Sequence, residues 1–328
     1  MKAQPVTYSV TIGATTYTTT HRPLLQEILT NADLNMPLNS CRLVFAQDDK
    51  EGLAAQPDDA VTVKLGYGQQ QETIFSGIVQ SIDWGIQRTT VRAISSLHKL
   101  TASRINTLYE HSSAGDMVKD VAQSRFKLKL QRVESGLSFP VYALGDRFSA
   151  YDHIRTLAQQ CGFDFYANSA DKLVFARYQA ALTHEVAYSN NLLRFTQTQP
   201  LTTTTGVEIY GESPASQGQG NQAYAWLTKK EVQAAAGKKS ITLVRQSDPT
   251  ARTQAIARKI AQATLQRTRQ KARGQVSVLG DGAIRLGDAI KVSKLPSSKQ
   301  NGTFKITGVT QRLSRWQGFC TDIAWEEI

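Results

Sequence analysis

The sequence predicts an α+β fold that is mostly β, with two tube-like β-barrel domains and a smaller mixed α/β region between them. Short runs of alternating apolar and polar residues, rich in β-branched and aromatic types, occupy both ends of the chain. Helical periodicity is concentrated in the middle. A strand–turn–strand pattern also occurs twice, at 59–63 and at 288–292. We therefore expect the first barrel at 1–104, the mixed region at 105–190 and the second barrel, with a basic helix, at 191–328.

The first region reads as a series of strands broken by Gly, Gln and Asp. The expected strand runs are VTYSVTIG (6–13), CRLVF (41–45), AVTVKLGYG (60–68), TIFSGIVQSIDWG (73–85) and TTVRAIS (89–95). One short helix is expected after Arg22-Pro23, because proline suits a first helical turn. Its buried stripe would be Leu24, Leu25, Ile28 and Leu29.

The middle region changes to helical periodicity. In SSAGDMVKDVAQSRF (112–126), Val118, Val121 and Ala122 share one helical face. The stretch SAYDHIRTLAQQCG predicts a second helix, capped by Ser149 and closed by Gly162 in the left-handed conformation. A hairpin follows, with FDFY (163–166) and LVFARY (173–178) joined by a turn at 168–171.

The last region returns to strands. GVEIYG (206–211) and SITLVR (240–245) alternate, and the Ser/Gly/Gln-rich stretch 212–222 between them is predicted to be a mobile surface loop. A helix of about 20 residues is expected to start at Asp248-Pro249, with the aspartate as its cap. Three or four further strands follow, and they contain the second copy of the repeat.

The repeat is longer than its five-residue start. Asp59-Ala60-Val61-Thr62-Val63 and Asp288-Ala289-Ile290-Lys291-Val292 lie 229 positions apart, which is too far for a solenoid of short units. Downstream of each copy the sequence again has Phe, Gly, Val and Trp in the same order. The matched residues are Phe75, Gly77, Val79 and Trp84 in the first copy, and Phe304, Gly308, Val309 and Trp316 in the second. The pattern predicts two similar β-domains, with each tryptophan anchoring the next strand.

Composition limits the class of protein. The 328 residues suffice for two or three domains. Three cysteines without close spacing indicate reduced thiols rather than a disulfide framework or zinc site. The N-terminus lacks the apolar segment of a secretory signal, and no run approaches 18 apolar residues. The sequence therefore predicts synthesis in the cytoplasm without membrane insertion.

The net positive charge of the chain lies in its last third. Residues 225–328 hold 19 Lys and Arg against 7 Asp and Glu, whereas residues 1–224 hold 19 against 20. The richest stretch, 251–274, alternates apolar and basic positions. It is either a solvated helix face or a docking surface for an acidic protein or for nucleic acid. Because no aromatic residues interleave with the charges, direct nucleic-acid binding is disfavoured. The candidate docking residues are Arg258, Lys259, Arg267, Arg269, Lys271 and Arg273.

No catalytic, cofactor-binding or metal-ligating constellation is recognisable. The five histidines are scattered, and the sequence lacks a phosphate-binding loop, a dinucleotide fingerprint and a nucleophile elbow. Asp281 and Asp288 flank a turn, where aspartate side chains commonly accept from nearby backbone N–H groups. We therefore expect no enzymatic activity and no cofactor.

Three stretches stand out across the chain: TIFSGIVQSIDW, AYDHIRTLAQQCGFDFYANSADKLVF, and RLGDAIKV with the downstream GTFKITGVTQRLSR. They resemble the late control protein D family, the baseplate hub proteins of contractile phage tails, which are related to the N-terminal hub part of VgrG. The resemblance implies a homotrimer in which each chain contributes two tube-like barrels to a ring of six.

This resemblance implies a structural adaptor that joins a hexameric tail tube to a trimeric spike. Because the sequence stops directly after the expected second barrel, the spike is expected to be a separate protein. The expected partners are a second and third copy of the chain, the tail tube protein, the spike and other baseplate proteins, within a virion tail baseplate or a phage-like particle. Two alternatives stay open: a tail-tip peptidoglycan hydrolase and a basic nucleic-acid-binding module.

Overall fold

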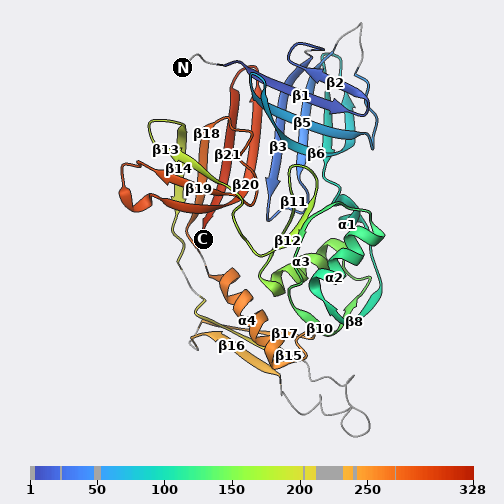
Figure 1. Cartoon of the computed structure of the whole chain (residues 1–328), viewed down its shortest axis with the longest axis vertical. Helices are drawn as coiled ribbons and strands as arrows, with labels where there is room; N and C mark the ends of the chain where they lie inside the picture. Colours follow the sequence, from blue (N-terminus) through green and yellow to red (C-terminus); the bar gives the residue numbers. More distant parts are fainter. Residues whose placement is uncertain are drawn as a thin grey trace.

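The computed structural model describes residues 4–22, 24–47, 53–201, 204–211, 232–238, 242–269 and 271–328. The predicted loop at 212–222 lies outside these residues. The fold is mostly β, as predicted, and most strands belong to one 13-stranded, largely antiparallel sheet. Figure 1 shows two β-rich parts at the top, with the helices and the smaller sheets below them.

We call the first β-rich part the N-terminal β-unit. Its strands are β1 (Val6–Ile12), β2 (Thr15–Thr18), β3 (Leu25–Asp33), β4 (Ser40–Ala46), β5 (Ala60–Tyr67), β6 (Gln70–Trp84) and β7 (Arg88–Ile94). The second part is the C-terminal β-unit. Its strands are β13 (Thr183–Ala187), β14 (Leu192–Thr198), β18 (Arg273–Leu279), β19 (Ala289–Ser293), β20 (Gly302–Ser314) and β21 (Gly318–Glu327), with a 3-10 helix at Ser298–Gln300. Each unit has its own hydrophobic core.

The remaining elements form a middle unit around a third core. The helices are α1 (His98–Ala102), α2 (Ala114–Lys119), a π-helix (Asp120–Arg125), α3 (Ala150–Cys161) and α4 (Gln254–Thr268). The strands are β8 (Thr107–Ser113), β9 (Leu130–Val133), β10 (Ser138–Leu144), β11 (Asp164–Ala167), β12 (Leu173–Ala176), β15 (Gly206–Gly211), β16 (Gln233–Gly237) and β17 (Leu243–Asp248).

The hydrophobic cores show which segments pack together. The core of the middle unit combines residues 97–175 with buried side chains from β15, β16 and α4. Strand β13 pairs with β19 and belongs to the C-terminal β-unit. The domain boundaries after residues 104 and 190 stay a prediction. The packing adds that the segment from β15 to α4 leaves the C-terminal β-unit and returns to it at β18.

Two predicted elements of the middle unit have the expected caps. Helix α3 begins at Ser149, whose hydroxyl accepts from the Asp152 backbone N–H, and ends at Gly162 with φ 68°. Strands β11 and β12 form the expected hairpin, and the side chain of Asn168 accepts from two backbone N–H groups of its turn. Local turn and cap chemistry therefore suffices to specify this segment.

The helix predicted after Pro23 is wrong, because Leu25–Asp33 is strand β3. Gln26 forms a bulge in the register with β4, so Leu25 and Ile28, three residues apart, are both buried. A bulge adds one residue to the strand, and the alternation of period two then resembles helical spacing. Pairing on both edges, with β4 and β20, stabilises the strand.

The predicted start of the basic helix is also wrong. The described part of α4 begins after Thr253, whose hydroxyl accepts from the Ile256 N–H, and it ends at Thr268. The carboxylate of Asp248 instead closes a local turn, because it accepts from the backbone N–H of Thr250 at 2.9 Å and from its hydroxyl at 2.6 Å. The Asp-Pro pair thus belongs to a turn that precedes the helix.

The two β-units repeat the same arrangement of six strands. Their spatial orders are β3-β4-β7-β6-β5-β1 and β14-β18-β21-β20-β19-β13. Equivalent neighbours are antiparallel in both series, except that β13 lies parallel to β19 where β1 lies antiparallel to β5. The strands that carry the sequence repeat, β5 and β19, occupy the same place in this order. The duplication therefore extends well beyond the short repeat.

Two pairs of bulges fix the equivalence of the strands. Gln80 in β6 is a bulge residue without a Cα partner in β7, and Thr307 in β20 is a bulge residue without one in β21. The two bulges occupy equivalent positions. Gln26 in β3 and Leu193 in β14 are bulge residues of the same kind. Bulges are specific structural features, so their occurrence at two equivalent positions strongly supports a common fold of the two β-units.

The register changes the residue match predicted from the sequence. The N–H of Val79 donates to the Asp59 carbonyl at 2.9 Å, and the N–H of Ile306 donates to the Asp288 carbonyl at 3.0 Å. Val79 and Ile306 are therefore equivalent. Counting back along each strand makes Phe75 equivalent to Gly302, and Gly77 equivalent to Phe304.

The phenylalanine and the glycine have thus exchanged places between the two copies. A Cβ added at Gly77 would lie 2.9 Å from the Phe75 ring, and one added at Gly302 would lie 3.1 Å from the Phe304 ring. The expected anchoring tryptophans are also wrong, because Trp84 and Trp316 lie at hairpin ends and are 60% and 96% exposed.

Candidate functional site

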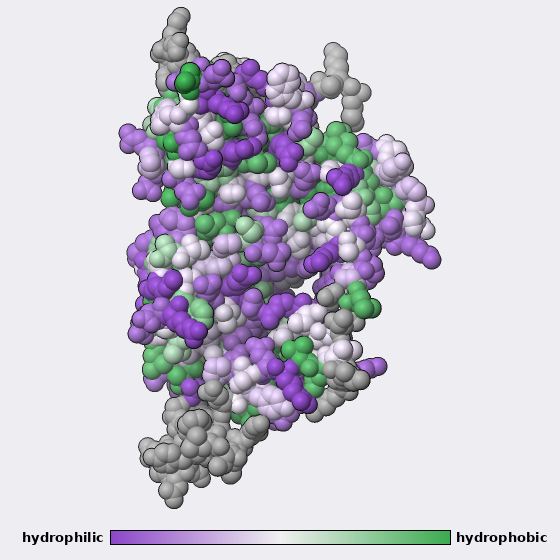
Figure 2. All heavy atoms as spheres, turned by 180° about the vertical axis from the view of Figure 1, so that it is seen from behind, coloured by the Kyte–Doolittle hydropathy of each residue, from purple (hydrophilic) through white to green (hydrophobic). Residues whose placement is uncertain are grey.

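A large cleft of about 890 Å³ lies where the middle unit meets the C-terminal β-unit. Helices α3 and α4 supply one wall, and β14, β18 and β21 supply the other. In the view from behind, a hollow bordered by hydrophilic residues is visible between the upper and lower parts of the molecule (Figure 2). The lining residues come from segments far apart in the sequence, from Asp33 to Ile328, so only tertiary folding assembles the cleft.

The cleft is strongly basic. Seven cationic side chains line it, against the three carboxylates of Asp33, Asp164 and Glu326. The cations are Arg155, Arg177, Arg267, Arg269, Lys271, Arg273 and Lys305. Within the described ranges, Lys305 is the one member of this set that has a carboxylate within 4.0 Å. The surplus of unneutralised cations makes the cleft a candidate site for an anionic surface.

The six predicted docking residues divide into two groups. Arg267, Arg269, Lys271 and Arg273 line the cleft. Arg258 is exposed elsewhere on α4, and Lys259 borders a separate hollow of about 440 Å³ beside His111. Sequence reasoning missed Arg155, Arg177 and Lys305, because they come from other elements. For Arg155, its position on the predicted helix that became α3 was the one sequence signal that could have pointed to the cleft.

Burial and neighbouring charges shift the pKa values of two side chains that line the cleft. Burial lowers the pKa of Arg267, and the neighbouring charge of Arg155 lowers it further. A bound anion would relieve this repulsion. Opposite them, burial raises the pKa of Asp164, while the Lys305 ammonium acts to lower it. Lys305 Nζ lies 2.7 Å from Asp164 Oδ1 and 3.4 Å from Glu326 Oε1, so this cation is already neutralised.

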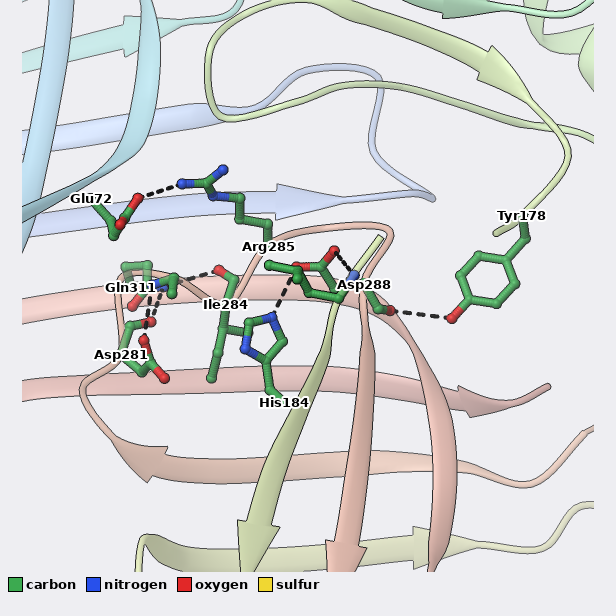
Figure 3. Close-up of polar contacts among 10 residues, drawn as sticks. Glu72, Tyr178, His184, Asp281, Ile284, Arg285, Asp288 and Gln311 are labelled. Carbon is green, nitrogen blue, oxygen red and sulfur yellow. Dashed lines mark hydrogen bonds and ion pairs between the residues drawn. The ribbon is translucent and has the colours of Figure 1, made fainter. Parts of the chain in front are cut away.

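A second polar cluster joins the two β-units through the loop before β19 (Figure 3). Asp288 Oδ2 lies 2.9 Å from His184 Nε2, and its Oδ1 accepts from the Leu182 N–H at 3.3 Å. Arg285 donates to Glu72 of β6 at 2.6 Å. Asp288 holds two neighbouring strands together at this place.

Asp281 completes the same loop. Its Oδ1 accepts from the Ala283 N–H at 2.9 Å, and its backbone carbonyl accepts from Gln311 at 2.9 Å. The interpretation as a turn residue fits Asp281, whose carboxylate accepts from the backbone two residues on. It does not account for Asp288, whose carboxylate contacts the distant Leu182 and His184 of the neighbouring segment. In the part of the chain that the structure describes, no group of three His, Cys, Asp or Glu side chains is placed to hold a metal ion.

Solved structures with the same fold include several tail proteins. The 43 kDa tail protein of prophage MuSo2 from Shewanella oneidensis is similar over 98% of both chains, with a TM-score of 0.72 and 13% identity. A tail protein from Neisseria meningitidis gives a TM-score of 0.71 and 13% identity, over 98% of this chain and 97% of that one. The fold of this chain is therefore that of a tail protein.

A third similar structure belongs to a secretion system. An E. coli component of the type VI secretion system gives a TM-score of 0.59 and 11% identity, over 97% of this chain and 76% of that one. A search among curated proteins finds no match. Among the described residues, no helix has the length and apolar character needed to cross a membrane.

The family comparison covers most of the sequence. The profile described as the Alg8 N-terminal domain matches residues 45–315, from the end of strand β4 to the hairpin between β20 and β21. This range includes the middle unit, the seven cations of the cleft and the C-terminal β-unit except strand β21. The chain therefore belongs to the Alg8 N-terminal domain family.

Proposed function

We propose that this chain is a non-enzymatic structural hub of a contractile tail baseplate, of the late control protein D type. It would form a trimeric adaptor between a hexameric tail tube and a trimeric spike. The observation that carries the proposal is the duplicated β-unit, with six strands in the same order and bulges at the same places.

The duplication provides a physical route between two symmetries. Three chains with two similar units each present six similar units, which suits a sixfold tube on one side. The same three chains keep threefold symmetry, which suits a trimeric spike on the other. Closed assembly would also cover strand edges that otherwise invite aggregation.

The similar structures support this setting without specifying the partners. They include two prophage tail proteins and a chain of the PdpA-VgrG complex from Francisella. The chain would accordingly be made in the bacterial cytoplasm and reside in a virion tail or a phage-like particle. The basic cleft would receive an acidic surface of a neighbouring baseplate protein, and no cofactor takes part.

The nucleic-acid alternative has one favourable observation, which is the same basic cleft. Binding by phosphate contacts would weaken steeply with salt. The chain would then bind a DNA duplex at 50 mM salt and release it at 200 mM salt. Loss of binding when Arg267, Arg269, Lys271 and Arg273 are changed together to Gln would also favour this alternative. No contact in the described residues favours the hydrolase alternative.

The decisive experiment is the particle mass of the purified chain, alone and with its co-expressed spike. Light scattering and native mass spectrometry should give three chains per particle, and electron microscopy should show a ring with six similar lobes. A protein that remains monomeric at high concentration, with its spike present, would refute the hub.

A further inference from the structure

The two β-units are joined by one strand pairing, whose counterpart is incomplete within a single chain. One edge of β20 pairs with β21. Its other edge pairs first with β19, through Gly302–Lys305, and then with β3, through Gly308–Ser314. The equivalent strand β6 pairs with β7 on one edge and with β5 on the other, up to Ile78. Beyond Val79, at 81–84, that second edge faces no described strand.

The partner strand is equally incomplete. Strand β14 is the equivalent of β3, since both pair with the next strand and carry the same bulge. Strand β3 uses its outer edge to bind β20. The outer edge of β14 has no partner among the strands that the structure describes. One chain therefore contains one complete junction and the two separate halves of a second.

We propose that a second copy of this chain completes the junction, with the edge of β6 at 81–84 pairing antiparallel with the β14 edge of the next copy at 197–200. The inference deepens the proposed hub and rests on it, because it specifies how neighbouring chains join. The contact is heterologous, since the two edges differ. Such contacts either close into a ring or continue as a filament, and three copies close the ring in the proposed hub.

The intrachain junction supplies the register of the proposed pairing. Thr310 lies opposite Asn31 in the complete junction. The strand equivalences convert this pair to Asp83 opposite Thr198 of the next copy. By the same conversion, Trp84 lies opposite Gln197, and Ser81 lies opposite Pro200.

Pro200 fits this register. The Leu34 N–H donates to the Thr307 carbonyl at 2.9 Å, so the adjacent pair, Asp33 and Gly308, is not hydrogen-bonded across the junction. In antiparallel pairing such positions alternate, and the N–H of a non-bonded residue points away from the partner strand. Pro200 is the equivalent of Asp33, so its missing N–H removes no interchain hydrogen bond.

Exposed apolar side chains mark both free edges. Trp84 ends β6 and Ile86 follows it, and they are 60% and 97% exposed. Leu193 lies in β14 and Leu201 follows this strand, and they are 56% and 81% exposed. In the complete junction, Gln311, which is the equivalent of Trp84, is 2% exposed, and its partner Thr30 is 4% exposed. A second copy would bury these apolar groups in the same way.

Disulfide crosslinking tests the register directly. Disulfides need Cα atoms within about 7 Å, a distance that directly opposed strand residues meet. The double variant Asp83→Cys/Thr198→Cys, in a Cys320→Ser background, should give covalent dimers and trimers on a non-reducing gel. A mixture of the two single variants should give dimers only. The intrachain control Asn31→Cys/Thr310→Cys should crosslink without changing the chain count.

A charge placed on the apolar edge gives an independent reading. Trp84→Lys should weaken association roughly tenfold or more, measured as the concentration at which the trimer dissociates. Trp316→Lys, at the equivalent hairpin end away from this junction, should leave association unchanged. Unchanged melting temperatures of both variants would exclude misfolding as the cause.

The outcomes separate this pairing from the hub itself. A trimer whose Asp83→Cys/Thr198→Cys variant crosslinks no better than Asp83→Cys/Thr196→Cys would overturn the pairing and leave the hub standing. Dimers from Asp83→Cys alone would reveal a symmetric contact and also overturn the pairing. A persistent monomer would overturn both proposals.

Discussion

Lys305 Nζ lies 2.7 Å from Asp164 Oδ1, and this ion pair ties strand β20 of the C-terminal β-unit to strand β11 of the middle unit. The side chains are 10% and 17% exposed. Burial raises the pKa of Asp164, and the ammonium group opposes that shift. The ammonium group thus partly offsets the effect of burial on this carboxyl group, and both residues line the cleft.

Lys305→Met should lower the free energy of unfolding by about 3 to 5 kcal/mol near neutral pH, because it leaves a buried carboxylate without its cation. Loss of the cation should raise the pKa of Asp164 further. The destabilisation should therefore shrink as the pH falls and the carboxyl group takes up a proton. Thermal denaturation at pH 7 and pH 5 measures both effects. Lys291→Met, at a 56% exposed side chain on β19, should change little at either pH.

Trp325→Ala should lower the free energy of unfolding by about 3 to 5 kcal/mol, because it opens a cavity in the core of the C-terminal β-unit. Trp325 is 1% exposed, and its ring centroid lies 4.1 Å from that of Phe304. Trp316→Ala, at a 96% exposed side chain, should change that free energy by no more than about 0.5 kcal/mol. Urea titration followed by circular dichroism compares the two. Equal losses would contradict the assignment of Trp325 to the core.

Gly77→Ala should destabilise the chain more than Gly302→Ala. A Cβ at Gly77 would lie 2.2 Å from the Ile94 carbonyl oxygen, which is backbone and cannot rotate away. At Gly302 the nearest atom is 3.1 Å away, at the far end of the Phe304 ring. Melting temperatures of the two variants decide the order. The reverse order would contradict the close approach of Gly77 to the Ile94 carbonyl group.

Cys161 should react slowly with thiol reagents at pH 8. Burial raises the pKa of its thiol to about 11, and the Leu137 N–H, 3.3 Å from Sγ, acts to lower it. The folded chain holds this proton more tightly than the unfolded chain, so the stabilisation is complete below the ordinary thiol pKa. It is lost as the pH rises toward about 11. Labelling followed by mass spectrometry of peptides, from pH 7 to pH 10, measures the trend, with urea-unfolded protein as the control.

The cleft cations should matter together rather than singly. The combined change of Arg267, Arg269, Lys271 and Arg273 to Gln should preserve the melting temperature but impair incorporation into tails. Exposed ion pairs are worth about 0–1 kcal/mol each, so single replacements should do little. Co-purification with assembled tails and particle delivery provide the readouts.

A charge-matched control changes four exposed cations away from the cleft, Lys64, Arg88, Lys294 and Lys299, to Gln. Normal assembly of tails with the cleft variant would contradict a docking role for the cleft cations. Equal impairment of both variants would reduce the effect to net charge.

Local chemistry made part of the fold readable from the sequence. Ser149 and Gly162 bound α3 because capping depends on a few neighbouring residues, and the turn at Asn168 follows the same logic. The alternation of strands β5 and β19 reflects a buried face and was visible in the repeat. Excess positive charge in the last third of the chain also needed no structure to recognise.

Long-range pairing decided the rest. Leu25 and Ile28 have helical spacing in the sequence. The segment is nevertheless strand β3, because it pairs with β4 and β20, and a bulge in its register with β4 produces that spacing. The hydrogen-bond register shows that Phe75 is equivalent to Gly302, and Gly77 to Phe304. The order of residue types in the sequence does not reveal this exchange. Arg155 and Lys305 belong to the cleft because α3 and β20 line it together with α4, whereas the sequence pointed only to the cations of 251–274. The sequence by itself determined local conformation and charge, while contacts between distant segments determined register and the composition of the cleft.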